Sequence, residues 1–269
     1  TRMLALTKLY CYPSSKWYKN EKLNELIHKS ISYWGKTMPK CPNWWHNDIG
    51  VPKKMIAAML CIREELTPEE VAVGLKVLER SAFGKTGQNK VWLAGNQLMK
   101  GLLTDDEALV VKARNVISEE IVMTDEEGIQ KDYSFHQHGP QMQFGNYGLT
   151  FVDVMSFWCS VLHGTDYAFS DEQNSLVMRL ISDGMNWTVY KGTMDHNACG
   201  RQPFRNGPAG KAASVTIAQR QFGDMIPPQG ELVGGRYFPC SDYGVFRQKD
   251  WFASVRMHSR RTVGYEYTN

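Results

Sequence analysis

The chain is organised around residues 131–150, KDYSFHQHGPQMQFGNYGLT. This stretch holds two histidines, two tyrosines, three glutamines and three glycines, and it shows the apolar periodicity of neither a helix nor a strand. We therefore expect an ordered loop. Loops on a rigid scaffold often carry binding and catalytic groups. The alternative is a polar connector whose histidines bond only to the backbone, and this stretch alone favours neither.

Composition limits the class of protein. With 269 residues, 42% of them hydrophobic, the chain can bury a large core as one big domain or as one domain plus part of another. A net charge of +3 mildly favours acidic partners. The sequence has no stripe of basic residues such as a dedicated nucleic-acid-binding protein carries. Aromatic residues make up 12%, and exposed ones could stack on sugar rings, although most should belong to the core.

The ends and the cysteines suggest the context of the chain. The six cysteines are scattered without a CxxC pair, which does not imply disulfides in a chain of this size. We find no signal peptide and no apolar run long enough to cross a bilayer. The chain starts without Met, already in apolar periodicity, and stops on a strand-like pattern. We therefore expect an excerpt of a longer, processed protein.

Apolar spacing predicts helices followed by strands. Helices are expected over residues 20–34, 55–66, 104–121, 151–162 and 209–221, with further helices starting after Thr67 and Ser170. Thr67, Thr104 and Ser170 each open a capping-box pattern. Residues 39–52 are expected to form a second motif-bearing loop. After residue 230 the pattern changes to strands. Repeated helix pairs favour an α/α array over a four-helix bundle.

Two pairs of residues could carry chemistry. His138 and Tyr147 lie nine residues apart in the central stretch, close enough to face one cleft. Arg201 and Arg205, four apart, would share one side of a helical turn, although Pro203 between them works against a regular helix. Paired arginines grip carboxylates or lower the pKa of a neighbouring acid. For the arginines taken alone, ion pairs within the fold are the favoured alternative.

Asn89 and two tryptophans are further candidates. Asn89 lies where a glycine-rich loop meets a helix, and in isolation an N-cap is its favoured role. Trp44 and Trp45 are adjacent, so they cannot both face the core of a regular helix. At least one should be exposed on a cleft wall, with paired buried anchors as the alternative.

A metal site is a minor alternative. His136, His138, His196 and Cys199 could form a tetrahedral nitrogen and sulfur set, but their spacing matches no zinc signature.

Five motifs together resemble one family. NWWHNDIGVP, TGQNKVW, YSFHQHGPQMQFGNYG, DHNACGR…R and SRRTVGYEYTN resemble, in this order and over nearly the whole chain, the polysaccharide lyase family of chondroitin AC lyase, hyaluronate lyase and xanthan lyase. The resemblance implies a mainly α fold, with an incomplete α/α toroid followed by the first strands of an antiparallel β-sandwich domain. Residues 1–225 would be the toroid catalytic domain, truncated at its N-terminus, and residues 226–269 the beginning of the β domain.

The resemblance also implies a mechanism of β-elimination. Asn89 and His138 would neutralise the carboxylate of a uronic acid, which acidifies the neighbouring C5 proton. Tyr147 would remove this proton and then protonate the leaving glycosidic oxygen. A free phenol has a pKa near 10, so Arg201, with Arg205, would stabilise the phenolate. His138 as the base remains the alternative.

The resemblance assigns further roles. Glu266 would orient an arginine or His138 from the sheet domain. The residues expected to bind substrate are Trp44, Trp45, Asn47, Gln137 and Asn269. Elimination needs no metal and no organic cofactor.

We therefore predict a lyase that cleaves chondroitin or hyaluronan and leaves an unsaturated uronate. A xanthan lyase-like activity, a non-catalytic carbohydrate-binding toroid and a zinc hydrolase are the alternatives. An acidic polysaccharide is the expected partner, without nucleic acid or membrane. The resemblance further implies a monomer that is secreted or periplasmic.

Overall fold

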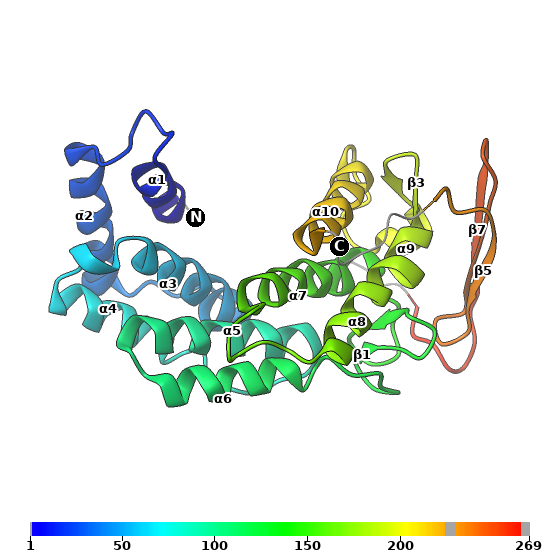
Figure 1. Ribbon diagram of the computed structural model, residues 1–269, viewed down its shortest axis with the longest axis horizontal. Helices are drawn as coiled ribbons and strands as arrows, with labels where there is room; N and C mark the ends of the chain where they lie inside the picture. Colours follow the sequence, from blue (N-terminus) through cyan, green and yellow to red (C-terminus); the bar gives the residue numbers. More distant parts are fainter. Residues whose placement is uncertain (1, 224–229, 265–269) are drawn as a thin grey trace. The chain divides into compact units, whose positions relative to one another are not determined.

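The computed structural model describes residues 2–223 and 230–264, so the predicted site residues Glu266 and Asn269 lie outside the described residues. The chain divides into two compact units (Figure 1). Unit 1 comprises Thr1–Lys85 and Asn89–Ile117, and unit 2 comprises Thr86–Gln88 and Ser118–Asn269. Within the described residues, no helix combines the length and the apolar character that a membrane span requires.

Unit 1 is helical. Its elements are α1 (Arg2–Cys11), α2 (Glu21–Thr37), α3 (Val51–Cys61), α4 (Pro68–Leu78), α5 (Gly87–Thr104) and α6 (Glu107–Ser118). Local signals set several of the ends. Asn20 accepts a hydrogen bond from the Leu23 backbone N–H at the start of α2, and Thr67 and Glu70 form the predicted capping box of α4. Such a cap typically stabilises a helix by about 1 kcal/mol.

The core of unit 1 lies where α1, α2, α3 and α4 meet. It consists of apolar side chains that repeat on one face of each helix: Tyr10, Leu23, Ile27, Ile31, Met55, Ile56, Met59, Ile62, Val77, Leu78 and Leu103. Burying one such aliphatic side chain stabilises the fold by about 1.5–3 kcal/mol. This packing, rather than helix propensity, therefore holds unit 1 together.

Two boundaries in unit 1 differ from the prediction. Residues 39–52 are not a loop throughout, because Trp44 and Trp45 are helical, His46–Gly50 form a π-helix and α3 begins at Val51. Pro52 fits in the first turn of α3 because the N–H that proline lacks has no helical partner there. The capping box expected at Thr104 is also wrong. Thr104 ends α5, and Asp106 instead accepts from the Leu109 N–H at 3.0 Å.

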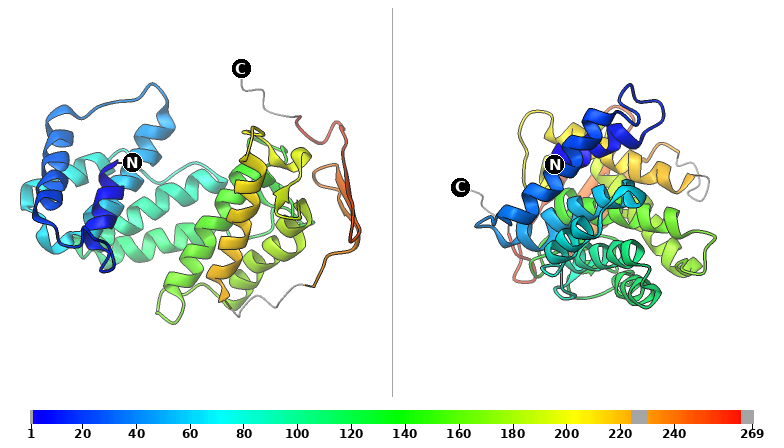
Figure 2. Two further views of the ribbon diagram at one scale, coloured as in Figure 1. Left: turned by 90° about the horizontal axis from the view of Figure 1, so that it is seen from above. Right: turned by 90° about the vertical axis from the view of Figure 1, so that its left-hand side faces the viewer.

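Unit 2 combines helices with short strands. Its main elements are β1 (Gly128–Ile129), β2 (Phe135–His136), a π-helix (Phe144–Gly148), α7 (Leu149–Leu162), α8 (Asp171–Arg179), a second π-helix (Leu180–Gly184), a 3₁₀ turn (Met185–Thr188), β3 (Val189–Tyr190), β4 (Thr193–Met194), α9 (His196–Cys199), α10 (Gly207–Gln221), β5 (Gly234–Phe238), β6 (Tyr243–Arg247) and β7 (Phe252–Arg256). The predicted capping box at Ser170 is confirmed at the start of α8. α10 packs along α7, as Figures 1 and 2 show.

The last three strands form an antiparallel sheet in the order β5-β6-β7. Side chains alternate along them, so Phe238, Tyr243 and Val245 are buried whereas Tyr237 and Phe246 are exposed. This alternation is typical of a sheet with one covered face. The predicted change from helices to strands after residue 230 is confirmed.

Aromatic rings fix the sheet against the central stretch. Phe144 packs on Phe238 with ring centroids 5.2 Å apart and on Tyr243 at 6.2 Å, and Phe238 and Tyr243 stack at 5.8 Å. Phe144 belongs to the π-helix that also carries Tyr147. The sheet therefore supports the turn that holds a predicted catalytic residue.

Residues 131–150 are not a loop throughout. Phe135 and His136 form β2, which pairs with β1, and residues 144–148 form a π-helix that continues into α7. A two-residue strand and a five-residue π-helix are too short to show a period in sequence. The loop prediction is therefore wrong for these residues.

A buried polar network ties β2 to the sheet. The His136 Nε2 atom lies 3.0 Å from the Ser241 Oγ atom, Ser241 donates to Ser134 at 2.7 Å, and Ser134 donates to Asp132 at 2.7 Å. Asp132 also accepts from the Cys240 backbone N–H at 2.7 Å. Because Ser241 donates onward, its oxygen accepts from a neutral His136 ring. Burial lowers the pKa of His136.

This lowered pKa predicts a pH-dependent stability. As the pH falls below about 6.5, the unfolded chain protonates His136 while the folded chain does not. The contribution of His136 to the free energy of unfolding is therefore complete above that pH. It declines towards acid by up to about 1.4 kcal/mol per pH unit. The variant His136→Gln, which still offers an N–H to Ser241, should show a flatter decline between about pH 7.5 and 5.5.

Urea unfolding at a series of pH values measures this difference. His163→Gln is the matched control because His163 is exposed, and it should keep the slope of the parent. An identical slope for His136→Gln and the parent would contradict the assignment.

Candidate functional site

Tyr147 lies in the π-helix between β2 and α7. The backbone N–H of Gly148 donates to the Gln143 carbonyl at 2.9 Å and closes this wide turn. Tyr147 itself is half-buried. π-Helical turns are rare and frequently occur at functional sites. The position of Tyr147 in such a turn therefore favours a functional role.

His138 and Arg201 both contact Tyr147. The rings of His138 and Tyr147 meet edge to face with centroids 4.9 Å apart and planes at 65°. The guanidinium carbon of Arg201 lies 5.6 Å from the centroid of the Tyr147 ring. A guanidinium over an aromatic face is attracted by the ring. The structure therefore brings together three of the predicted catalytic residues.

Arg205 is placed differently. Arg201 and Arg205 do not share a helical turn, because residues 200–206 are irregular, as Pro203 indicated, and α10 begins at Gly207. Asn206 adopts a left-handed conformation (φ 69°) just before the helix. Arg201 is half-buried against Tyr147, whereas Arg205 is exposed.

Two glycines allow the Tyr147 turn to approach the Arg201 segment. A Cβ atom on Gly145 would collide with the backbone carbonyl of Cys199, and one on Gly200 would collide with the side chain of Asn146. Gly200 also has a positive φ of 62°, which other residues rarely adopt. The close approach of these two segments therefore depends on both glycines.

The loop at His138 has a strained backbone. His138 (φ 65°) and Gly139 (φ 74°) are both left-handed, which costs a residue with a Cβ about 1–2 kcal/mol. The Oε1 atom of Glu127 accepts from the backbone N–H groups of His138 at 2.7 Å and of Gly139 at 3.0 Å. These charge-assisted hydrogen bonds hold the strained conformation.

The other oxygen of Glu127 binds the base of the same loop. It accepts from the hydroxyl of Thr86 at 2.5 Å and from the side-chain amide of Gln137. Gln137 is only 1% exposed, and its Oε1 atom accepts from the Gln88 backbone N–H at 3.0 Å. The structure thus uses both ends of this amide internally. A role of Gln137 in substrate binding remains a prediction.

A small cavity adjoins the Arg201 segment. Its volume is about 10 Å³, and its lining comprises Gln141, Met142, Gln143, Asn146, Gly200, Arg201 and Arg256. Arg256 is the last residue of β7. The cavity is therefore lined by two arginines, Arg201 and Arg256, and carries positive charge from both.

Asn89 belongs to unit 1. It lies within the first turn of α5, not before it, so the N-cap alternative is wrong. The residue is 7% exposed, and its Oδ1 atom has no hydrogen-bond partner among the described residues. A buried amide with an unsatisfied atom costs about 1–3 kcal/mol. Because this atom is an acceptor, donation to a substrate carboxylate would use the Nδ2 atom instead, and that role of Asn89 remains a prediction.

The adjacent tryptophans Trp44 and Trp45 differ in exposure. Trp44 is 43% exposed, and the Nζ atom of Lys85 lies 4.8 Å from its ring centroid. Trp45 is half-buried and meets Trp92 edge to face at 5.2 Å. The side chain of Trp45 also covers Gly50, where a Cβ would collide with the indole. Of this pair, Trp44 is therefore the one whose ring is accessible to a ligand.

Asn47 holds the segment before the tryptophans. Its Oδ1 atom accepts from the Cys41 N–H at 2.8 Å, and its Nδ2 atom donates to the Cys41 carbonyl at 2.7 Å. The structure gives Asn47 this internal role, and substrate binding by Asn47 remains a prediction.

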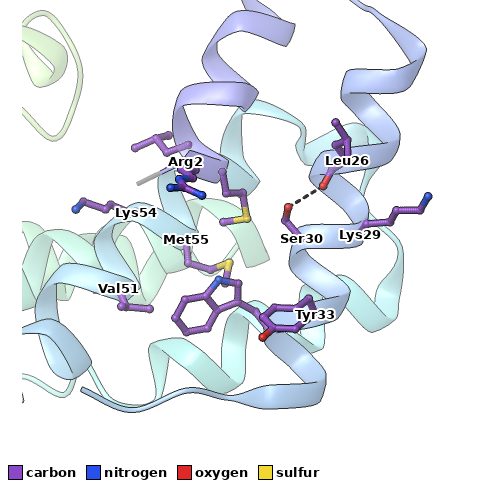
Figure 3. Close-up of a pocket in the computed structure, with 11 residues that line it drawn as sticks. Arg2, Leu26, Lys29, Ser30, Tyr33, Val51, Lys54 and Met55 are labelled. Carbon is purple, nitrogen blue, oxygen red and sulfur yellow. Dashed lines mark hydrogen bonds between the residues drawn. The ribbon is translucent and has the colours of Figure 1, made fainter. Parts of the chain in front are cut away.

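A larger pocket lies elsewhere in unit 1 (Figure 3). It measures about 630 Å³ and lies among α1, α2 and α3. Leu26, Val51 and Met55 contribute apolar lining, and the cations are Arg2, Lys29 and Lys54. None of the predicted site residues line it, so we do not place the candidate site there.

The zinc alternative finds no support in the side-chain positions. Among residues 2–223 and 230–264, no three His, Cys, Asp or Glu side chains gather as a possible metal site. His136, one of the four residues considered, is hydrogen-bonded to Ser241 instead.

Comparison with known proteins decides the family. Residues 1–223 match the family described as "Polysaccharide lyase family 8, N terminal alpha-helical domain". The chain belongs to polysaccharide lyase family 8. This confirms the relationship predicted from the five motifs.

This family 8 chain is similar to several named lyases. It is 32% identical to chondroitinase-AC of Pedobacter heparinus, over 98% of the chain and 41% of that protein. It is 25% identical to hyaluronate lyase of Thermasporomyces composti, over 93% of the chain and 38% of the relative. The chain thus spans less than half the length of these relatives.

Solved structures of the family share the fold. A chondroitinase AC lyase matches with a TM-score of 0.82 and 28% identity, over 99% of this chain and 44% of its own. Paenibacillus xanthan lyase matches with a TM-score of 0.86 and 21% identity, over 99% of this chain and 31% of its own. The predicted fold class is confirmed, namely a mainly helical chain of the α/α-toroid class followed by antiparallel strands.

Sequence reasoning missed two residues that shape the site of this family 8 chain. Glu127 has the acidic neighbours Asp125 and Glu126, and nothing in the sequence distinguishes it from them. Arg256 occupies an ordinary position in a strand pattern. Their contacts with residues far along the chain reveal them, and no local signal could have done so.

The unequal exposure of the tryptophans predicts unequal effects on stability. Trp45→Ala should lower the free energy of unfolding by about 3 kcal/mol, because it empties the contacts with Trp92 and Gly50. Trp44→Ala should change it by less than about 0.5 kcal/mol. Urea unfolding of the two variants measures the difference. Equal, large losses would instead identify the pair as buried anchors.

Proposed function

We propose that the protein is a lyase that cleaves a uronate-containing glycosaminoglycan, chondroitin or hyaluronan, by β-elimination. The observation that carries the proposal is that the Tyr147 ring contacts both the imidazole of His138 and the guanidinium of Arg201. Membership of family 8 and the 32% identity to a protein named chondroitinase-AC support it.

In the proposed reaction Tyr147 acts as base and then as acid. Its phenolate takes the C5 proton of the uronate, and the electrons of the C5–H bond form the C4=C5 double bond. The bond from C4 to the glycosidic oxygen breaks, and the phenol returns a proton to that oxygen. The products are an unsaturated uronate and a new hydroxyl group. Arg201 places a positive charge beside the Tyr147 ring, as an electrostatic partner for the negative charge that the reaction develops there.

The uronate carboxylate must be neutralised before its C5 proton becomes acidic enough to remove. We assign this task to His138 and Asn89, as donors directed at the carboxylate. Glu127 supports His138 by fixing its backbone. His138 as the base, with Tyr147 as the acid only, is the alternative assignment of roles.

Two other functions are weaker. A carbohydrate-binding protein without turnover would need exposed aromatic rings such as Trp44, but it would not need a phenol in contact with both an imidazole and a guanidinium. A xanthan lyase-like activity has support from a similar protein of that name, although at 25% identity over 71% of the chain. The acidic polysaccharide partner, the monomeric state and the secreted or periplasmic location belong to the same proposal.

The decisive experiment compares three natural polymers with a chondroitin that has lost its carboxylates. The protein is incubated with chondroitin, hyaluronan and xanthan, and the ultraviolet absorbance of unsaturated uronate is followed. We expect absorbance to grow with chondroitin or hyaluronan and not with carboxyl-reduced chondroitin, which lacks the group that acidifies C5. A chelator should leave the rate unchanged.

Other outcomes would contradict the proposal. New reducing ends without the absorbance would indicate hydrolysis. Loss of activity on chelation, restored by zinc, would favour the zinc hydrolase. Retardation of the polymer without any cleavage would favour the binding protein.

Tyr147→Phe tests the assigned base. The change removes only the hydroxyl group, so the fold should survive while kcat falls by ~10⁴-fold, the upper end for a general acid–base group, because one residue serves both steps. Tyr33→Phe is the control, since Tyr33 is 63% exposed and lies in unit 1 outside the candidate site. Turnover within about threefold of the parent would remove Tyr147 from the mechanism.

A further inference from the structure

Lys211 is a buried cation whose partners lie in the two segments that carry Tyr147 and Arg201. It projects from α10 and is only 8% exposed. Its Nζ atom donates to Asn146 Oδ1 at 3.0 Å, to the Cys199 carbonyl at 2.6 Å and to the Arg201 carbonyl at 2.5 Å. All three N–H bonds of the ammonium group are thus directed at oxygen atoms.

The environment of this ammonium group is unusual. Lysine is rarely buried, because moving the charge out of water is costly unless hydrogen bonds compensate. Burial lowers the pKa of Lys211. Its three acceptors are neutral carbonyl oxygens, so no carboxylate among them offsets the charge. A cation kept at this cost needs a reason beyond packing.

The acceptors of Lys211 adjoin the candidate site. Asn146 immediately precedes Tyr147, and Arg201 contacts the Tyr147 ring through its side chain. A single ammonium group therefore ties the Tyr147 turn to the backbone of Arg201.

Side-chain amides extend the contact of Lys211 further. Asn146 Nδ2 donates to Gln143 Oε1 at 3.1 Å, and Gln143 Nε2 donates to Gln141 Oε1 at 2.5 Å. The Gln141 amide in turn donates to the backbone carbonyl of Gly264. Each amide accepts through oxygen and donates through nitrogen, so the chain has one direction, from the ammonium group to the carbonyl. Hydrogen bonds aligned in this way polarise and strengthen one another.

The far end of this amide chain also lies beside the His138 loop. The Val263 N–H donates to the Pro140 carbonyl at 3.0 Å, next to the carbonyl of Gly264 that Gln141 binds. Pro140 follows His138 and Gly139 directly. One end of the amide chain therefore lies at the Arg201 backbone. The other end lies at Gly264, whose neighbour Val263 binds the His138 loop at Pro140.

We propose that Lys211 is a positioning residue for the proposed elimination. Its buried ammonium group holds the Arg201 segment against the Tyr147 turn. Through the side chains of Asn146, Gln143 and Gln141, it also holds the Gly264 segment against that turn. The proposal rests on the proposed function, since Lys211 binds Asn146 and the backbone carbonyls of Cys199 and Arg201 and acts by fixing Tyr147 and Arg201. Displacing a catalytic group by about 1 Å can reduce the rate by ~10²-fold.

Hydrogen exchange tests the tether without any substrate. Lys211→Met keeps the length of the side chain but leaves three buried oxygens without their donor. We expect amide exchange, followed by mass spectrometry, to quicken by roughly tenfold in residues 141–148 and 195–206, because their local opening becomes easier. Arg220→Met is the matched control, a cation removed from an exposed position of the same helix, and it should leave both segments unchanged. Unchanged exchange in Lys211→Met would overturn the proposal.

Kinetics test the consequence for catalysis. Lys211→Met should lower kcat by ~10²-fold while KM stays within about threefold, because the change misplaces reacting groups rather than removing substrate contacts. Lys211→Arg, which keeps a cation with several donors, should recover part of the loss. Faster exchange with normal kcat would overturn the positioning role. A parent protein without lyase activity would refute the proposed function, while the exchange measurement still decides whether Lys211 ties the two segments.

A second variant covers the case in which Lys211→Met does not fold. Asn146→Ala interrupts the chain after its first step and leaves the contacts of Lys211 with the Cys199 and Arg201 carbonyls intact. Exchange should then quicken in residues 141–148 and stay at the parent rate in residues 195–206. Parent-like exchange in both segments would overturn the proposed chain.

Discussion

The approach of the Tyr147 turn to the Cys199–Arg201 backbone is the constraint on which the candidate site depends. Gly145 has no room for a Cβ beside the Cys199 carbonyl, so the two segments can touch only at a glycine. Lys211 binds both segments from the buried side. The cation–ring contact between Arg201 and Tyr147 follows from this approach, because it brings two residues 54 positions apart in the sequence together.

A second constraint acts on His138. Its left-handed backbone is unfavourable for any residue with a Cβ, and the carboxylate of Glu127 offsets that cost with two backbone hydrogen bonds. Strain that is held in this way fixes the direction of a side chain more tightly than a relaxed loop would. The carboxylate of Glu127 binds the backbone at His138 and the side chains of Thr86 and Gln137, whereas the guanidinium of Arg201 lies against the Tyr147 ring. The charges of the site therefore have separate tasks.

The sheet that follows the helices is part of the same structure. Phe238 and Tyr243 pack on Phe144 in the Tyr147 turn, and Ser241 completes the polar network of His136. Removing the strands would expose these rings and leave buried polar groups without partners, at a cost of about 1–3 kcal/mol for each such group. The helical residues of unit 2 and the sheet thus depend on each other, although their sequence patterns are entirely different.

The sequence by itself determined the local features of this protein. The capping boxes at Thr67 and Ser170, the strands after residue 230 and the five motifs of the family were all predictable, because caps, alternation and motifs are written in neighbouring residues. Only the tertiary structure decided that Gln137 and Asn47 are engaged internally, that Arg201 rather than Arg205 contacts Tyr147, and that Glu127 and Lys211 support the site. These roles depend on hydrogen bonds and ring contacts between distant segments. The identity of a residue does not by itself tell whether its side chain contacts water, a buried carbonyl or a substrate.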